Sequence, residues 1–255
     1  MNDNPKTLIV IPARLESSRV PGKMLIKIGK YTMIQHMWRI CSASKLAHKV
    51  VVATDSQKII NNIQQIGGQA LLTSPHHSCG TDRVSEIARR FPNYSHIINV
   101  QGDMPLLKTQ VIDKLINSFN QSPSEVITPC TPITSPDQIN SLAVVKVVKS
   151  FDNHAIYFSR LPVPYNRDQK GKITYFRHIG IYGYQRKLIL KFPQIKSKLE
   201  DIEKIELLRL LDNRFQIKLI TTNYNETSVN TPQELKIVQE KFRQNLSTAK
   251  SISTK

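Results

Sequence analysis

Nearly continuous apolar runs, separated by amphipathic segments, constrain the fold of this chain more than any other feature. The clearest runs are LIVIPA (8–13) and HIINVQ (96–101). A strand is apolar without interruption when both of its faces are covered, as in parallel sheets with helices on either side. Further strand-like runs occupy 49–54, 70–73, 125–129, 143–148, 178–184 and 215–221.

Segments with helical character fall between these runs. They lie near 32–45, 56–66, 82–91, 109–120, 153–160, 186–191, 200–213 and 232–244. The alternation through the first 130 residues indicates βαβ units, and so predicts an α/β fold with a mainly parallel central sheet. Open sheets of this kind bind ligands beyond the carboxyl ends of their strands. We expect a single domain over 1–245 and a flexible polar tail over 246–255.

Composition narrows the class of protein. Hydrophobic residues make up 40% of the 255 residues and charged residues 22%, enough apolar material for a real core. No run reaches the roughly 18 apolar residues of a membrane span, and the N-terminus lacks a signal-peptide pattern. We therefore expect a cytoplasmic protein without a membrane partner. The three scattered cysteines predict reduced thiols rather than a disulfide framework or a zinc site.

The net charge of +17 raises the question of nucleic-acid binding. The lysines are spread along the chain, no block of five basic residues occurs, and no aromatic residues interleave with a basic cluster. Single-strand binders need such interleaving. The pattern argues against a nucleic-acid partner. It leaves a generally lysine-rich surface or a site for a polyanionic small molecule such as a nucleoside triphosphate.

A basic turn follows the first predicted strand. Arg14, Arg19 and Lys23 lie within ten residues, and Pro21-Gly22 forms the turn that returns Lys23 toward the strand end. Backbone N–H groups combined with arginine forks and a lysine point charge can cradle a triphosphate. The segment is not a P-loop. From the spacing alone, an ordinary basic loop remains an alternative.

A second segment, Asn99 to Pro105, places Asp103 at a tight glycine turn after a buried strand. A carboxylate in this position suits a hard Mg²⁺ ion that bridges protein and phosphates. Gly-Asp also closes many strands as a plain turn, so the segment carries the argument only together with the basic turn.

These segments, with others, resemble one family over residues 8 to 240. The motifs are PARxxSxRxPGK (12–23), ATD (53–55), GTDR (80–83), VQGD (100–103), YFSR (157–160), RHIGIYGY (177–184), ExxExxExxR (200–209) and VxTPxxL (229–235). The set is similar to the CMP-3-deoxy-manno-octulosonate (CMP-Kdo) synthetases. The resemblance implies a three-layer fold of the nucleotide-diphospho-sugar transferase type, with a small dimerisation arm near 150–180. It also implies a homodimer.

The resemblance also implies roles for individual residues. CTP is held by Pro12, Ala13, Arg14, Arg19 and Lys23, with His77, Gly80, Thr81 and Arg83 near the base and ribose. Lys23, Gln101 and Asp103 are the implied catalytic residues. Asp103 and Asn230 are the implied ligands of Mg²⁺. The sugar acid lies among Arg160, His178, Tyr182, Glu203 and Glu206.

The implied reaction is the attack of the 2-hydroxyl of Kdo on the α-phosphorus of CTP, with release of pyrophosphate, for lipopolysaccharide biosynthesis. Positioning and electrostatics carry most of such a reaction. Taken without the family, His178 in an apolar strand fits a core histidine. The i+3 spacing of Glu200, Glu203 and Glu206 fits a solvated helix face, and Tyr182 with Tyr184 fits a core-facing pair.

The sequence departs from the family pattern at residues that bear on the site. Asn230 replaces a metal carboxylate, Leu207 an amide of the sugar pocket and Ala143 an asparagine. Cys79 replaces a serine, and Met104 a common glutamate. These changes suit either a working enzyme with altered sugar selectivity or a homologue that binds nucleotide and turns over poorly. We favour the enzyme, because the phosphate cations and Asp103 are kept. A transferase for sialic acid or a sugar alcohol phosphate is the other alternative, and RHIGIYGY argues against it.

Overall fold

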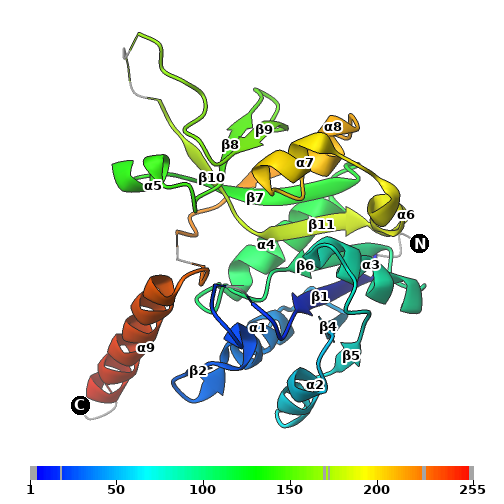
Figure 1. The fold of residues 1–255 in the computed structure, drawn as a ribbon, viewed down its shortest axis with the longest axis vertical. Coiled ribbons are helices and arrows are strands. Elements are labelled where there is room, and N and C mark those ends of the chain that lie inside the picture. The colour runs from blue at the N-terminus through cyan, green and yellow to red at the C-terminus, as the bar shows by residue number, and fades with distance from the viewer. Residues whose placement is uncertain (1–4, 18, 169–170, 172, 226–227, 253–255) are drawn as a thin grey trace.

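A central mixed sheet with helices on both faces forms the body of the molecule (Figure 1). This computed structural model describes residues 5–17, 19–168, 171, 173–225 and 228–252, with side chains through 244. The strands of the main sheet are β1 (Thr7–Ala13), β4 (Lys49–Thr54), β5 (Ala70–Leu72), β6 (His96–Val100), β7 (Val126–Pro132), β8 (Lys146–Lys149), β9 (Ala155–Ser159), β10 (Phe176–His178), β11 (Ile181–Gln185) and β12 (Ile217–Thr221).

The helices confirm most of the predicted segments. They are α1 (Met33–Ser42), α2 (Gln57–Gln64), α3 (Gly80–Arg90), α4 (Thr109–Asn120), α5 (Pro136–Asn140), α6 (Arg186–Lys191), α7 (Lys198–Glu203), α8 (Leu208–Asp212) and α9 (Pro232–Ile252). Short 3₁₀ turns occur at η1 (Lys23–Leu25) and η2 (Phe192–Gln194), and a small hairpin joins β2 (Lys27–Ile28) to β3 (Tyr31–Thr32). Among the described residues, no helix combines the length and apolar character needed to cross a membrane.

The first half of the sheet is parallel, in the order β5-β4-β1-β6. Along β1, Leu8 and Val10 pack into one core, and Ile9 and Ile11 pack into the other. Helices α1, α2 and α4 cover the second face, and α3, α6 and α8 cover the first. Both faces of β1 are therefore buried, which explains its unbroken apolar sequence and confirms the three-layer α/β prediction.

The second half of the sheet is mixed. Strand β11 runs antiparallel to β6 and to the start of β7, and β10 continues alongside the end of β7. Strands β8 and β9 extend the sheet beyond β10, while β12 lies on the other side of β7. The predicted single strand over 178–184 is therefore two strands. They are separated at Ile179-Gly180: both pair with β7, but the second neighbour is β8 for β10 and β6 for β11.

The helix predicted near 153–160 is wrong. Residues Ala155–Ser159 form β9, which pairs antiparallel with β8. The segment contains Ile156, Tyr157 and Phe158 in succession, residue types that favour a pleated, half-buried strand. Tertiary pairing with β8 therefore outweighs the local helical pattern.

The helix predicted over 200–213 is two short helices rather than one. Lys204 ends α7 in the left-handed conformation at φ 55°, and α8 begins at Leu208. The three glutamates at 200, 203 and 206 consequently do not share one solvated helix face. The break places Glu206 against the start of α3.

Helix α9 begins as predicted at Thr231-Pro232. The hydroxyl of Thr231 accepts from the Glu234 amide at 3.2 Å, and the Glu234 carboxylate accepts from the Thr231 amide at 2.8 Å. This reciprocal capping box fixes the helix start. The backbone is helical through Ile252, and the flexibility expected from 246 stays a prediction. Residues 253–255, and residues 169, 170 and 172 of the predicted arm, lie outside the described residues.

Candidate functional site

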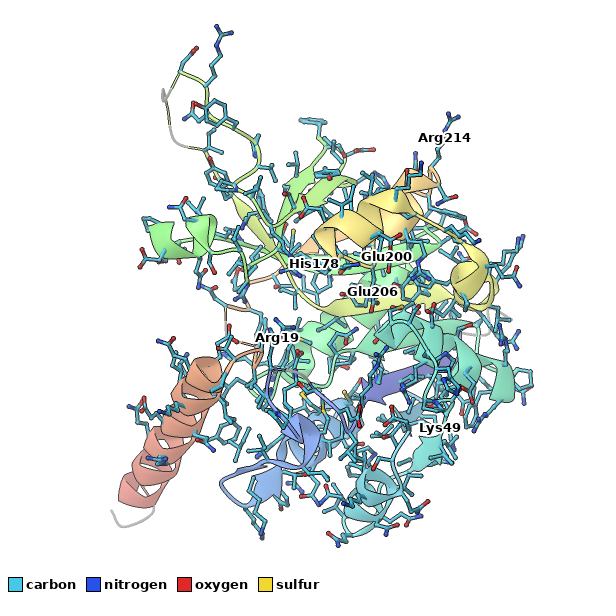
Figure 2. The ribbon with its side chains drawn as sticks, viewed as in Figure 1. Arg19, Lys49, His178, Glu200, Glu206 and Arg214 are labelled. Atoms are coloured by element: carbon cyan, nitrogen blue, oxygen red, sulfur yellow. The ribbon has the colours of Figure 1, made fainter. Side chains whose placement is uncertain are left out.

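A cavity of about 840 Å³ opens between the parallel half of the sheet and the β8–β10 region. It is lined by residues that follow strand ends: Arg19 after β1, Gln101 and Asp103 after β6, and Arg160 after β9. His178, Tyr182, Glu206 and Asn230 complete the predicted residues that line it. Figure 2 labels three of the residues that line this cavity: Arg19, His178 and Glu206.

Lys23 links the basic turn to the acid after β6. Its ammonium donates to Asp103 Oδ2 at 3.2 Å and to the carbonyl of Val229 at 2.9 Å. Its side chain is 12% exposed and that of Asp103 20%. The amide of Val229 donates to the backbone carbonyl of Asp103 at 2.8 Å, so the segment that bears Asn230 is tied to the same point. Three segments far apart in sequence therefore converge on Asp103.

Gln101 occupies a tight space at the end of β6. A Cβ atom added to Gly180 would lie 3.2 Å from Gln101 Cγ, and one added to Gly80 would lie 3.3 Å from Gln101 Nε2. Both distances are shorter than ordinary van der Waals contact. The glycines at 80 and 180 thus admit the Gln101 side chain between α3 and β11, where it faces the cavity.

Of the residues predicted to bind the nucleotide, only Arg19 is among the residues that line this cavity. Arg14 donates to the carbonyl of His77 at 2.8 Å, which joins the basic turn to the segment before α3. His77 is itself paired with Glu86 at 2.6 Å. Pro12 and Ala13 are buried at the end of β1. These contacts order the wall next to the cavity.

Arg83 differs from the predicted role of a nucleotide contact. Its side chain is fully buried and donates to Asp55 Oδ2 at 2.7 Å and to Thr73 Oγ1 at 2.6 Å. The other oxygen of Asp55 accepts from the Leu15 amide at 3.2 Å. Burial lowers the pKa of Arg83, and Asp55 raises it. Arg83 therefore supports the basic turn through Asp55, which the sequence showed only as part of the ATD motif.

Glu206 caps the N-terminus of α3. Its carboxylate accepts from the Gly80 amide at 3.0 Å and from the Thr81 hydroxyl. Asn99 Nδ2 also donates to Thr81 Oγ1, at 3.0 Å. Burial raises the pKa of Glu206, and the bonds from Thr81 and Gly80 lower it. A negative charge at a helix N-terminus is favourable, so the carboxylate is held where it also faces the cavity.

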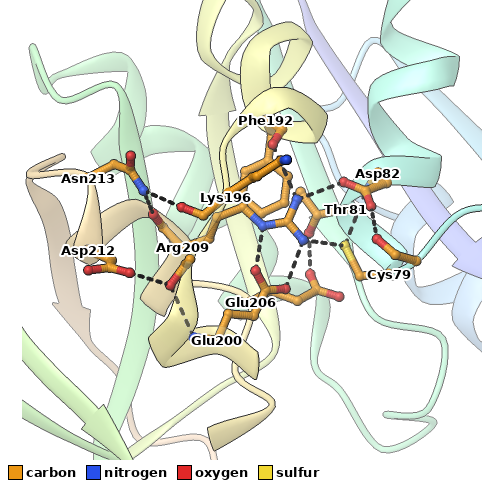
Figure 3. Close-up of polar contacts among 12 residues, drawn as sticks. Cys79, Thr81, Asp82, Phe192, Lys196, Glu200, Glu206, Arg209, Asp212 and Asn213 are labelled. Carbon is orange, nitrogen blue, oxygen red and sulfur yellow. Dashed lines mark hydrogen bonds and ion pairs between the residues drawn. The ribbon is translucent and has the colours of Figure 1, made fainter. Parts of the chain in front are cut away.

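Arg209 stabilises the region where α7 ends and α8 begins through several polar contacts (Figure 3). Its guanidinium donates to both oxygens of Glu200, at 2.5 and 2.9 Å, and to Asp82 Oδ1 at 3.0 Å. Cys79 caps α3 through its sulfur, which accepts from the Asp82 amide at 3.4 Å and from Arg209 at 3.8 Å. Glu200 is therefore a structural partner of Arg209 rather than a solvated residue.

His178 carries a defined tautomer. The Thr128 hydroxyl donates to the carbonyl of Ile181 at 2.7 Å, so it accepts from His178 Nε2 at 3.0 Å. The ring stacks on Tyr182 with centroids 5.5 Å apart. Burial, with a smaller effect of Arg177, lowers the pKa of His178 to about 3. The neutral imidazole keeps Nδ1 as an acceptor, which suits a hydroxyl better than a carboxylate.

Main-chain carbonyls and the Glu203 carboxylate hold Arg160 in place. Its guanidinium donates to the carbonyls of Glu203 at 2.9 Å and Leu142 at 2.9 Å. The Glu203 carboxylate accepts from the Arg160 amide at 3.1 Å and from Ser159 Oγ at 2.8 Å. Glu203 is not among the residues that line the cavity, so in this structure it positions Arg160 rather than facing the predicted sugar site.

The departures from the family pattern separate into two groups. Asn230, Ala143 and Met104 line the cavity, so these changes alter its surface. Leu207 is 1% exposed, packs in the core with α8 and is not among the residues that line the cavity. The change at 207 therefore removes no group from the cavity described here.

The sequence did not point to two basic residues near the cavity, one in its wall and one behind it. Arg177 lines the cavity and lies over the Tyr224 ring, 5.9 Å from its centroid. Lys146 is fully buried behind the cavity wall. For Arg177, the sequence signal was a basic residue directly before His178. A lone lysine within the apolar run 143–148 was a signal for the second.

Sequence comparison places this geometry among known proteins. The family model for cytidylyltransferases matches residues 8–220. The 3-deoxy-manno-octulosonate cytidylyltransferase of Fusobacterium nucleatum is 38% identical over 242 residues, 94% of this chain and 98% of its own length. The chain belongs to the 3-deoxy-manno-octulosonate cytidylyltransferase family. The member from Leptospira biflexa is 39% identical over 92% of this chain and 95% of its own length.

Solved structures agree with this family. A CMP:2-keto-3-deoxy-manno-octonic acid synthetase complexed with CTP matches with a TM-score of 0.89 and 35% identity, over 94% of this chain and 99% of that one. The 4-diphosphocytidyl-2C-methyl-D-erythritol synthase of Anaerococcus prevotii, at 13% identity and a TM-score of 0.64, shares the fold alone. The family and the fold predicted from the motifs are confirmed.

The residues around Asp103 fit a magnesium ion that takes most of its ligands from phosphates. Asp103 offers a carboxylate and Asn230 an amide oxygen, and both face the cavity. Within the described part of the chain, no three carboxylate, histidine or cysteine side chains form a ready-made metal cluster. Mg²⁺ is commonly held by one or two carboxylates together with substrate phosphates and water. Asp103 and Asn230 fit this pattern of Mg²⁺ coordination.

Proposed function

We propose that this chain is a cytidylyltransferase that transfers CMP from CTP to the 2-hydroxyl of Kdo or a close analogue, releasing pyrophosphate. One observation carries the proposal: the Lys23–Asp103 contact borders a cavity whose far wall holds Arg160, His178 and Tyr182. Phosphate-binding cations and a metal-type carboxylate thus adjoin groups suited to a polyhydroxylated acid. The 38% identity to named Kdo cytidylyltransferases over most of the chain supports the choice of substrate.

The chain's own residues would work mainly by positioning. Arg14, Arg19 and Lys23 would hold the triphosphate with its α-phosphorus toward the cavity, and Gln101 would lie between the two substrates. A bound magnesium ion would supply charge neutralisation on the phosphates, with Asp103 and Asn230 as its protein ligands. Charge stabilisation of this type is the main contribution of proteins to phosphoryl and nucleotidyl transfer.

The acceptor half of the cavity would hold the sugar acid. Arg160 and Arg177 supply positive charge for a carboxylate, and neutral His178 offers Nδ1 to a hydroxyl. Glu206 and Tyr182 face the same space. Asn230 and Ala143 change the cavity surface, so an amino-substituted or otherwise altered Kdo is a second candidate acceptor. A homologue that binds CTP without turnover is the alternative outcome.

The deciding experiment measures pyrophosphate release with CTP, Mg²⁺ and Kdo. The proposal predicts turnover that requires all three components, and much slower release with UTP or with sialic acid. CTP binding without release for any sugar acid would indicate the silent homologue. Turnover with Kdo would place the chain in the supply of activated sugar for lipopolysaccharide, and a cytoplasmic location follows from that role.

A homodimer formed by the arm is part of the same proposal. Five large apolar side chains in or near this arm are exposed, and apolar residues that gather on a surface mark an interaction site. They are Leu142, Phe151, Ile156, Leu161 and Tyr165. Replacing Leu161 by Asp should convert a dimer to a monomer in size-exclusion chromatography with light scattering. Leu72→Asp, which changes an exposed leucine outside the arm, is the matched control. A wild-type protein that elutes as a monomer at high concentration would refute the dimer.

A further inference from the structure

A buried lysine stands behind the acceptor half of the cavity. Lys146 lies at the start of β8, and its side chain is fully buried. Its ammonium donates to the carbonyl oxygens of Ser141 at 2.8 Å and Val144 at 2.7 Å, and to that of Arg160. Three carbonyl acceptors use all three N–H bonds of an ammonium, whereas a neutral amine has only two. These three acceptors favour the charged ammonium, against burial and the nearby Arg160, which lower the pKa of Lys146.

No carboxylate within the described residues forms an ion pair with this ammonium. An apolar side chain of similar length would avoid the cost of burying this charge, which Glu203 stabilises without forming an ion pair. The buried ammonium makes three hydrogen bonds that a methionine in its place could not make. The three carbonyls that accept these bonds belong to Ser141, Val144 and Arg160, and all three residues line the cavity.

Lys146 and Glu203 bind the two main-chain polar groups of Arg160. Glu203 accepts from the Arg160 amide at 3.1 Å, and Lys146 donates to the Arg160 carbonyl. The guanidinium is then oriented by the carbonyls of Leu142 and Glu203 at 2.9 Å each. Leu142 lies in the same loop, 141–144, that Lys146 binds at both ends. One buried ammonium thus fixes both the backbone of Arg160 and the loop that receives its side chain.

We infer that Lys146 is the positioning residue that aims Arg160 at the anionic acceptor sugar, acting through main-chain carbonyls without touching the substrate. The inference rests on the proposed function, since it assigns Arg160 to the acceptor. The inference predicts different effects on the two substrates, because Lys146 contacts neither the basic turn nor Asp103. Its loss should weaken acceptor binding and leave CTP binding intact.

The test is a double-mutant cycle between Lys146→Met and Arg160→Met. Lys146→Met should raise the KM for Kdo about tenfold and change the KM for CTP less than about twofold. In the Arg160→Met background, the same change should have little further effect on the KM for Kdo, because the two residues act as one unit. Calorimetric titration of Kdo into each variant without CTP gives the same cycle independently of turnover.

Lys149→Met is the matched control. It removes a lysine from the same strand, but Lys149 donates only to the Asn153 side chain and lies over the Phe176 ring. Its KM values should match those of the wild type. If Lys146→Met does not yield folded protein, Lys146→Gln keeps two N–H donors and should show the same selective loss.

The outcomes separate this inference from the proposed function. If the wild type neither binds nor turns over Kdo, the proposed function fails. If the wild type is active but Lys146 and Arg160 show additive effects, the inference fails alone. Equal rises in the KM values for both substrates, or an unchanged KM for Kdo, would also overturn it.

Discussion

Replacing Arg83 by Met tests whether this residue supports the basic turn or contacts the nucleotide. Its guanidinium is fully buried and bonded to Asp55 and Thr73. Removing one member of a buried pair costs about 3–5 kcal/mol, because the remaining charge is left unpaired. Asp55 is 17% exposed and recovers some hydration, so we expect the lower end, about 3 kcal/mol.

For a chain of this length, about 1 kcal/mol corresponds to a fall in Tm of about 2–4 °C, so Arg83→Met should lower Tm by about 6–12 °C. Thermal unfolding followed by circular dichroism measures this shift. Adding Asp55→Asn to Arg83→Met removes the unpaired charge and should recover part of the loss. The CTP affinity of folded Arg83→Met should fall modestly, because Asp55 loses one of the bonds that fix it against Leu15.

Arg19→Met is the contrasting variant, since Arg19 is exposed and lines the cavity. It should leave Tm within about 1 °C and raise the KM for CTP several-fold, because surface charges contribute little to stability. The reasoning would be refuted if Arg83→Met kept the wild-type Tm and raised only the KM for CTP. That result would make Arg83 a direct ligand of the nucleotide.

Three further variants test other parts of the structure. Asn230→Asp should raise the apparent Mg²⁺ affinity in turnover assays, whereas Asn225→Asp in the same segment should not; equal affinities would contradict the metal site. His178 is deprotonated above about pH 3 in the folded state but only above about 6.5 when unfolded, so the unfolded state binds more protons between these values. Stability should therefore fall as pH drops from 6.5 to 3, and it should fall less steeply in His178→Gln. If the urea midpoints of the wild type and the variant change with pH in parallel, the buried neutral ring is refuted. Gly183→Ala places a methyl 2.7 Å from Ile127 and should cost about 1–3 kcal/mol in urea unfolding, and an unchanged midpoint would contradict that packing.

Local pattern predicted the parallel half of the fold well. Strands β1, β4 and β6 were recognised because their apolar runs are long and both of their faces are buried. The start of α9 was recognised because Thr231 and Glu234 form a capping box that short-range chemistry alone determines. Predictions failed where pairing partners were distant in sequence, as in β9 and in the division between β10 and β11.

The candidate site shows the same division. Residue types and spacing pointed to Lys23 and Asp103, and the family resemblance added Arg160 and His178. They did not reveal Arg83 as a buried support. Nor did they reveal Glu206 as the cap of α3, because each role depends on which residue lies opposite in space.

The order of residues was enough to predict the alternation of strands and helices, the family, and the charged groups available for catalysis. These properties follow from side-chain polarity and short-range periodicity, which are local. Only the tertiary structure decided that Lys23 meets Asp103 and Val229, that Glu203 holds Arg160 from outside the cavity, and that Lys146 is buried beneath that arginine. Contacts of this kind join residues tens to hundreds of positions apart, so they are set by how the sheet folds on itself.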